Sequence, residues 1–224
     1  VQDATWLLWN GKDMDRKAVD MGKQRALEML KTASSLEIKT SGEGKAALRI
    51  TNLTGHKLPT GYPEGRRMWV NARFFDSSGA LLKEVGKYAP REDTLLGKPV
   101  TAPTLLDPEQ TRVYECLPAI SDAQAKKYNK QPGKSFHFVL NDYIAKDNRI
   151  PPKGFKNSTF KVHLSEPVGA EYADGQYWDD VPLEPPAGCK RIVVNLMYQP
   201  VSWEYIKFLA EENKTDDWGK RLYE

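Results

Sequence analysis

Three histidines are the side chains of this sequence best suited to binding chemistry, and one of them lies in an unusual loop. His56 is in TNLTGHKLPTGYPEGRRMW, residues 51–69, between two segments that alternate like strands. Gly55 beside it removes side-chain bulk, and Pro59 and Pro63 each fix a backbone angle. Such a stiff loop holds an imidazole with little conformational freedom left to lose on binding, although a tight crossover between strands has the same composition. His56 is therefore a candidate binding residue, with a structural turn as the alternative.

The sequence lacks the common motifs of catalysis. It contains no G-x-S-x-G nucleophile elbow, no G-x-x-x-x-G-K-[ST] phosphate loop and no H-E-x-x-H zinc motif. Acidic residues are numerous, but no pair of them is singled out for general acid and base work. No C-x-x-C-H occurs, so we expect no covalently bound haem in this chain. We expect a protein that is not an enzyme.

The periodicity of apolar residues predicts a mainly β protein, an antiparallel β-sandwich with an N-terminal and a C-terminal flanking helix. Residues 13–34 have helical spacing with Asp13 available as a cap, and residues 200–213 have it with Ser202 as the N-cap. Seven segments between them alternate like strands: 46–53, 68–75, 80–85, 111–116, 135–140, 159–164 and 191–199. We divide the chain into a helical segment at 1–35 and a β-sandwich domain with its C-terminal helix at 36–224.

The other two histidines lie in predicted strands. In SFHFVL, residues 135–140, the alternation places His137 on the face opposite Phe136 and Phe138. In TFKVHL, residues 159–164, the same count places His163 nearer to solvent. For a single histidine, a surface position or a hydrogen-bonded structural role is the ordinary interpretation.

Charge, hydropathy and cysteine content bound the partners and the location of the protein only loosely. The 33 basic residues exceed the 30 acidic ones by only 3 and are scattered, so we expect no nucleic-acid partner. No apolar stretch is long enough for a transmembrane segment, and no signal segment opens the chain. The chain starts at Val1, as expected for a processed or truncated product of an exported protein. Cys116 and Cys189 could form one disulfide or remain two thiols.

Three long segments carry a resemblance to a known family. They are NLTGHKLPTGYPEGRRMWV, SFHFVLNDYIAKDNRIPPKGF at 135–155 and VNLMYQPVSWEYIKFL at 194–209. Together they resemble the haem-free C-terminal domain of exported bacterial multihaem c-type cytochromes, in which the C-x-x-C-H motifs precede this domain. The resemblance implies an accessory or assembly module of a redox system, periplasmic, on the outer surface or extracellular. It also implies a multihaem cytochrome or other chains of a larger assembly as partners.

The same domain is distantly similar to the copper-binding surface proteins of methanotrophs, of the MopE and CorA type. That resemblance implies His56 and His137 as the metal ligands, and an imidazole pair suits copper. Thr54 stands where those proteins have an oxidised tryptophan as a third ligand. An axial contact from either imidazole to a partner's haem is the alternative that the same residues allow.

Two other kinds of site remain as alternatives. Asn141, Asp142, Asp147 and Asn148 offer oxygen atoms for calcium, although their spacing is not that of an EF-hand and turns use the same residues. Five aromatic residues in expected loops or ends suggest a carbohydrate-binding or structural β-sandwich subunit of an extracellular assembly. They are Trp6, Trp9, Tyr177, Trp178 and Trp218, and the structural alternative would also bury Arg66 and Arg67 against a partner.

Overall fold

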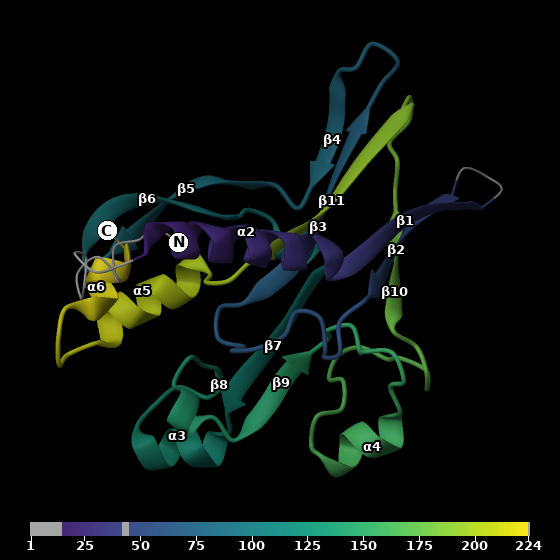
Figure 1. The fold of residues 1–224 in the computed structure, drawn as a ribbon. Helices are drawn as coiled ribbons and strands as arrows, with labels where there is room; N and C mark the ends of the chain where they lie inside the picture. The colour runs from purple at the N-terminus through teal and green to yellow at the C-terminus, as the bar shows by residue number, and fades with distance from the viewer. Residues whose placement is uncertain (1–14, 42–44, 224) are drawn as a thin grey trace.

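The computed structural model describes residues 15–41 and 45–223, and nearly all of its strands pair antiparallel in three sheets. The first sheet has the order β1 (Ser34–Ser41), β2 (Lys45–Asn52) and β10 (Trp178–Leu183). The second has the order β11 (Arg191–Gln199), β3 (Arg67–Phe75), β7 (Val113–Ile120) and β8 (Gly133–Lys134), with β4 (Leu81–Val85) beside β3 and β9 (Tyr143–Asp147) beside β7. β5 (Tyr88–Leu95) and β6 (Lys98–Leu105) form a separate hairpin. The predicted mainly β fold with flanking helices is confirmed (Figure 1).

The main core lies between the first two sheets. Leu48 and Ile50 of β2 and Val181 of β10 pack against Val70 and Phe74 of β3. These are alternate residues of their strands, so their side chains share one face of each sheet. The alternation that predicted strands at 46–53 and 191–199 reflects this packing of alternate side chains, whereas β3 is buried on both faces because Trp69 packs with Leu105 and Val113 on its other side.

Helix α5, near the C-terminus, holds the β5–β6 hairpin. α5 (Trp203–Glu212) begins at Ser202, whose hydroxyl accepts a hydrogen bond from the Tyr205 amide, as predicted, and α6 (Trp218–Tyr223) follows. The Trp203 indole donates to Asp93 of β5 at 2.6 Å, and the Lys207 ammonium lies 3.0 Å from the same carboxylate. These partners fix the hairpin on α5, so the long predicted connection 86–110 is an ordered part of the fold.

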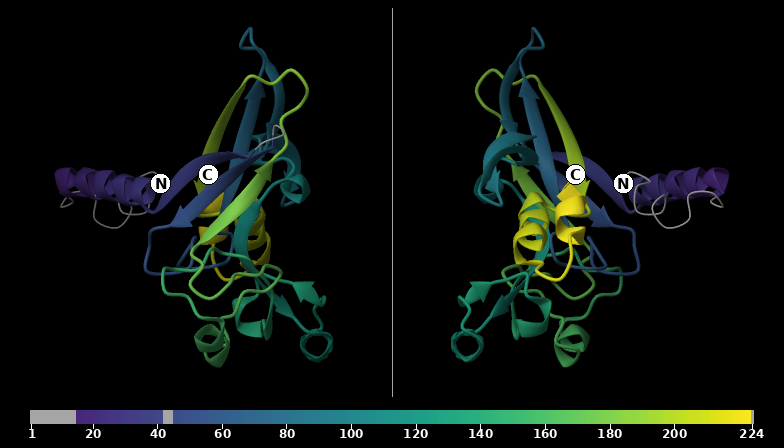
Figure 2. Two further views of the ribbon diagram at one scale, coloured as in Figure 1. Left: turned by 90° about the vertical axis from the view of Figure 1, so that its right-hand side faces the viewer. Right: turned by 90° about the vertical axis from the view of Figure 1, so that its left-hand side faces the viewer.

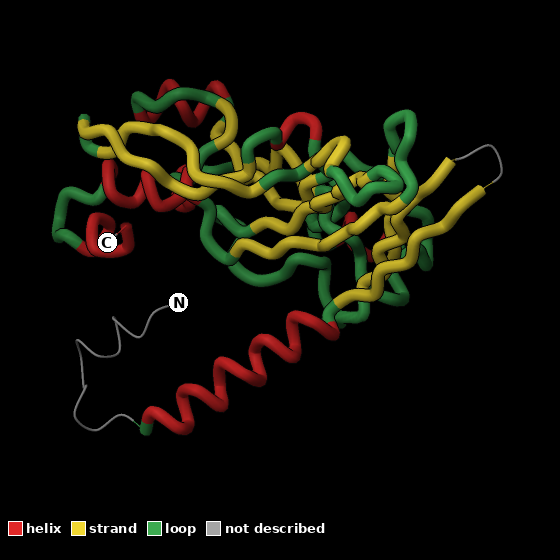
Figure 3. The backbone as a smooth tube through the Cα atoms, turned by 90° about the horizontal axis from the view of Figure 1, so that it is seen from above, coloured by secondary structure: helices red, strands yellow, loops and turns green. Residues whose placement is uncertain are grey.

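The N-terminal helix stands apart from the sheets. α2 (Arg16–Thr32) is capped by the Asp15 carboxylate, which accepts a hydrogen bond from the Ala18 amide at 3.0 Å. No residue of α2 is buried, and Figures 2 and 3 show the helix extending away from the body and reaching it only near β1. The expected cap Asp13 lies outside the described residues, and the division of the chain at residue 35 stays a prediction.

The predicted strand at 135–140 is wrong. The segment instead leads into a 3₁₀ turn, η2 (Phe138–Leu140), with His137 at its start. The Ser135 hydroxyl accepts from the His137 amide at 2.9 Å, and the Asn141 side chain donates to the Ser135 carbonyl at 3.0 Å. Such local bonds compete with a strand ladder for the backbone, which alternation alone does not reveal.

The predicted strand at 159–164 is also wrong, because residues Asn157–Val162 form the short helix α4. The carboxylate of Asp174 accepts from both the amide and the side chain of Asn157, at 2.8 and 3.0 Å. An acceptor at the start of a helix satisfies amides that have no partner within it. Since Asp174 is 17 residues away, no local pattern could indicate it. The remaining helical elements are α3 (Asp122–Tyr128) and the 3₁₀ turn η1 (Pro108–Gln110).

The structure also describes the two cysteines and the length and polarity of the helices. Cys116 and Cys189 are free thiols, and burial raises the pKa of the Cys116 thiol to about 11. Within residues 15–41 and 45–223, every helix is too short or too polar to cross a bilayer.

Candidate functional site

The three segments that carry the family resemblance meet in space. An aromatic cluster forms where they meet, and it consists of Tyr62, Phe136, His137, Phe138, Tyr205 and Phe208. The hydroxyls of Tyr62 and Tyr205 lie 3.0 Å apart, and the ring centroids of Phe136 and Tyr205 lie 5.0 Å apart. Burial, and then the hydrogen bond with the Tyr62 hydroxyl, raise the pKa of the Tyr205 hydroxyl. Residues far apart in the chain thus build one surface that could bind a ligand or a partner.

The loop approaches α5 so closely that it needs a glycine. Gly65 has a positive φ of 73°, and a Cβ added there would lie 2.6 Å from Cβ of Tyr205. Both the conformation and the space exclude a larger side chain. The sequence PEGRR therefore allows the loop to lie directly against the helix.

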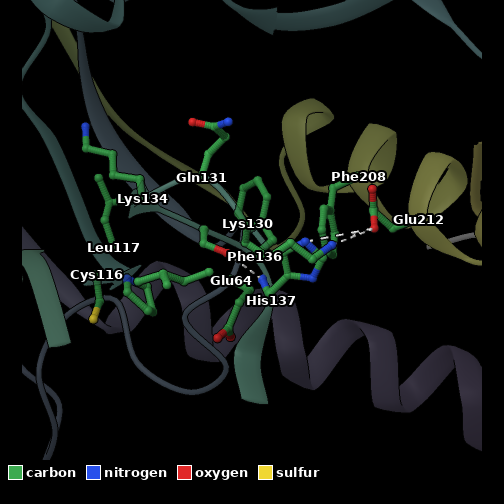
Figure 4. A pocket seen from close by; sticks show the side chains of 13 residues that line it. Glu64, Cys116, Leu117, Lys130, Gln131, Lys134, Phe136, His137, Phe208 and Glu212 are labelled. Atoms are coloured by element: carbon green, nitrogen blue, oxygen red, sulfur yellow. Dashed lines mark hydrogen bonds and ion pairs between the residues drawn. The ribbon is translucent and has the colours of Figure 1, made fainter. Parts of the chain in front are cut away.

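His137 is held within the aromatic cluster. Its ring packs edge-on against Phe208 at 5.0 Å between centroids, and its Nε2 lies 3.9 Å from the Glu212 carboxylate (Figure 4). The side chain is partly accessible, because it lines a cavity of about 520 Å³ together with Lys130, Lys134, Phe136 and Phe208. A histidine so placed can bind a metal ion or an acidic group that enters the cavity.

Glu64 lines the same cavity and is the least expected residue of the site (Figure 4). It is only 2% exposed, and neither of its carboxylate oxygens has a hydrogen-bond partner in the described part of the chain. Burying an ionised carboxylate without a partner is costly. In the sequence it lies between Pro63 and Gly65 and was not among the candidate site residues. The sequence offered no signal for this burial, because the residues that line the cavity with Glu64 lie far from it in the chain.

A buried ion cluster anchors the loop on its other side. The Asp147 carboxylate lies 2.7 Å from the Lys57 ammonium and 2.7 Å from the Arg149 guanidinium. Burial opposes ionisation of Asp147, but the hydrogen bonds and charges of Arg149 and Lys57 outweigh it, so the pKa of Asp147 is lowered. The cluster fixes the loop residue Lys57 to the end of β9.

The side chain of His56 is exposed, and the fold fixes this residue through its main-chain carbonyl. The side chain of Asn52 donates to the His56 carbonyl at 2.7 Å, and the Thr54 hydroxyl donates to the same oxygen at 2.9 Å. No hydrogen bond, ion pair or ring contact joins the imidazoles of His56 and His137 among the described residues. His163 is exposed at the end of α4.

Copper binding by His56 and His137 stays a prediction. No group of three or more His, Cys, Asp and Glu side chains within residues 15–41 and 45–223 could hold a metal ion, so the two imidazoles would have to act as a pair. Protein purified from its native source is expected to carry about one copper per chain, lost in both His56→Ala and His137→Ala. Elemental analysis measures this, with His163→Ala as the control. Copper that survives in either variant would contradict the pair.

The four residues suggested for calcium have other partners in this structure. Asp142 accepts from the Ser121 hydroxyl at 2.6 Å, and Asn148 donates to the Val113 carbonyl at 2.7 Å. Asp147 belongs to the ion cluster, whereas Oδ1 of Asn141 is buried and has no partner in the described chain. Calcium at these four residues stays a prediction, and only Asn141 has a free acceptor.

The residues of the carbohydrate alternative are dispersed. Tyr177 and Trp178 pack edge to face, Arg49 lies over the Trp178 ring at 4.9 Å, and Trp218 is half exposed on α6. Trp6 and Trp9 lie outside the described residues. Arg67 is buried within the chain itself, where it donates to Gln199 at 2.8 Å, so it is not available to a partner. Arg66 donates to the Thr60 carbonyl at 2.8 Å.

Comparison with known proteins adds one solved structure. No family model and no curated protein matches this chain. A penta-haem cytochrome c552 from Thermochromatium tepidum is similar in structure, with 18% sequence identity and a TM-score of 0.46. The match covers 83% of this chain and 37% of the cytochrome. The chain thus spans little more than a third of that protein's length.

Proposed function

We propose that this chain is an exported, non-catalytic assembly module of a multihaem-cytochrome-type redox system, and that it contacts the haem-bearing part through helix α2. The observation that carries the proposal is the exposure of α2, a helix of 17 residues with none of them buried. Most of the stability of helices in proteins comes from packing an apolar face and not from helix propensity. α2 therefore needs a surface to pack on.

One face of α2 is suited to such packing. Placed at 100° per residue, one side of the helix carries small and apolar side chains without a charge. These residues are Ala18, Val19, Gly22, Ala26, Met29 and Leu30. Met29 is 71% exposed and Leu30 is 41% exposed, so the face is uncovered. A Cβ at Gly22 would meet nothing within 4 Å, which leaves room for a close neighbour.

The sequence resemblance supports a haem-bearing protein as the partner that packs on the apolar face of α2. In the family that the chain resembles, the haem-binding portion precedes this domain, and α2 is the described element on that side. The haem-bearing part is either a portion of the same polypeptide or a separate chain. In both cases it would cover the apolar face of α2.

A single charge on the apolar face tests this proposal. When the unaltered protein from its native source is sedimented, haem detected by its Soret absorbance is expected to move with it. Leu30→Glu should lower the amount of associated haem at least about tenfold, because it places a carboxylate in an apolar contact. Gln24→Glu is the matched control, since it adds the same charge on the opposite side of the same helix. Sedimentation followed by absorbance measures the association when the haem is carried by a separate chain. If the haem-bearing part belongs to the same polypeptide, the thermal unfolding temperature of the two variants is compared instead. Equal behaviour of both variants, or native material without haem, would refute the proposal.

A further inference from the structure

A second cavity is also lined by Glu64 but not by His137 or Lys130, and its chemistry differs from that of the first. Its volume is about 680 Å³, within the usual range of ligand sites. Glu64 and Pro118 line both cavities. The remaining walls come from η2, β9 and the turn after α4.

Buried oxygen atoms without partners belong to three of the residues that line this cavity. Both carboxylate oxygens of Glu64, Oδ1 of Asn141 and Oε2 of Glu166 are buried, and none has a hydrogen-bond donor among the residues that the structure describes. All four atoms accept hydrogen bonds, and buried acceptors in native proteins are nearly always satisfied. What the site lacks is a donor, and a positively charged donor would satisfy Glu64 best.

The charged residues of the cavity wall also favour a positively charged ligand. Glu64, Asp142, Asp147 and Glu166 line it, and no lysine, arginine or histidine of the described chain does. Two of these carboxylates already have partners, Asp147 in the ion cluster and Asp142 at Ser121. Glu64 and Glu166 do not have a cation paired with them in the described ranges. The first cavity differs, because Lys130 and Lys134 line it.

The apolar walls of the cavity favour an organic cation over a metal ion. Pro63, Pro118, Phe138, Tyr143, Leu164 and Val168 line the cavity. Metal ions such as calcium need six or more oxygen ligands, and the described residues hold no cluster of three or more suitable side chains. An alkyl stem packs on apolar walls, and aromatic faces attract its cationic head.

We propose that this cavity binds an organic cation, an ammonium or guanidinium group on an apolar stem, with Glu64 as its main counter-ion and Glu166 and Asn141 as further acceptors. The cation belongs either to a free small molecule or to a lysine or arginine side chain of a partner. This site is independent of helix α2. Its failure and the failure of the assembly proposal are therefore distinguishable.

Calorimetric titration of the whole chain tests the site with defined probes. Pentylammonium and pentylguanidinium should bind, and 1-pentanol, which has the stem without the charge, should bind at least about tenfold more weakly. Glu64→Gln keeps the shape of the side chain and removes the charge, so it should weaken binding of the cations about tenfold or more. Glu109→Gln, an exposed carboxylate outside the cavity, is the matched control and should bind like the unaltered protein.

Each outcome decides the proposal. Equal binding of pentanol, equal binding by Glu64→Gln, or no heat with millimolar cation would overturn it, and calcium binding abolished by Glu64→Gln would assign the site to a metal instead. The thermal unfolding temperature of Glu64→Gln should be unchanged or higher, because an unpaired buried charge is removed. If that variant nevertheless unfolds, Glu166→Gln gives the same test.

A peptide distinguishes the two sources of the cation. If a blocked Gly-Arg-Gly peptide binds as well as pentylguanidinium, the natural ligand is a side chain of a partner, and if the free cation binds more tightly, the ligand is a small molecule. Both outcomes support a cation site.

Discussion

Replacing Asp147 by alanine is expected to lower the free energy of unfolding by about 3–5 kcal/mol. The side chains of Asp147 and Lys57 are only 6% and 8% exposed, and Arg149 bonds the same carboxylate through two nitrogens at 2.7 Å. Removing the carboxylate leaves two cations with little access to water and no counter-charge. Urea denaturation followed by far-ultraviolet circular dichroism measures the loss.

The control for this variant is an ion pair on the surface. Asp180 lies 2.6 Å from Arg49, but its side chain is 41% exposed, so Asp180→Ala should cost about 1 kcal/mol or less. A loss from Asp147→Ala no larger than that from Asp180→Ala would contradict the role of the buried cluster. The comparison separates the effect of burial from that of distance.

The same carboxylate predicts how stability depends on pH. The pKa of Asp147 is lowered in the folded protein, so folding favours the ionised form. Its contribution is therefore fully present above the unfolded pKa of about 3.9 and is lost as the pH falls through the folded pKa. Unfolding free energies from pH 7 to pH 3 should decline less in Asp147→Ala than in the unaltered protein. Parallel profiles would mean that Asp147 is not a source of the acid sensitivity.

The parts of the fold that could be predicted from the sequence are those in which one face of an element is buried. β2 and β11 alternate because every second side chain packs in the core, and α5 begins at a serine whose hydroxyl caps the helix. The β5–β6 hairpin escaped prediction because it is mostly exposed and contains three prolines and several charges. Without a buried face, a strand has no reason to alternate.

The site was harder to predict than the fold because its residues act across long sequence separations. The stiffness of the loop at 51–69 was visible from its prolines and glycines, but the burial of Glu64 was not, because the cavity it lines is built by residues far away in the chain. His137 was assigned to a strand face, whereas it lines a cavity beside Phe208. The resemblance of three separate segments was the most useful signal, because those segments are the ones that meet.

Asn52 explains the stiffness of the histidine loop better than its prolines do, and Asn52→Ala is expected to lower the free energy of unfolding by about 2–4 kcal/mol. Asn52 is 1% exposed, and its amide donates to the carbonyls of His56, Ile150 and Pro151 at 2.7, 2.9 and 3.0 Å. Its Oδ1 also accepts from the Thr54 amide at 2.8 Å. One side chain thus joins the start of the loop to the strand-like segment after β9, and its loss leaves buried carbonyls without a donor.

Two matched variants identify which half of the Asn52 amide matters. Asn52→Asp keeps the oxygen that accepts from Thr54 but places a second oxygen against three carbonyls, so it should cost at least as much as Asn52→Ala. Thr54→Val removes only the hydroxyl bonds within the loop and should cost about 1 kcal/mol. Denaturant unfolding gives the free energies, and hydrogen exchange of the amides at 54–58 shows whether the loop opens before the core. If Asn52→Asp is as stable as the unaltered protein, the donor bonds do not hold the loop, and its rigidity must come from Pro59 and Pro63 instead.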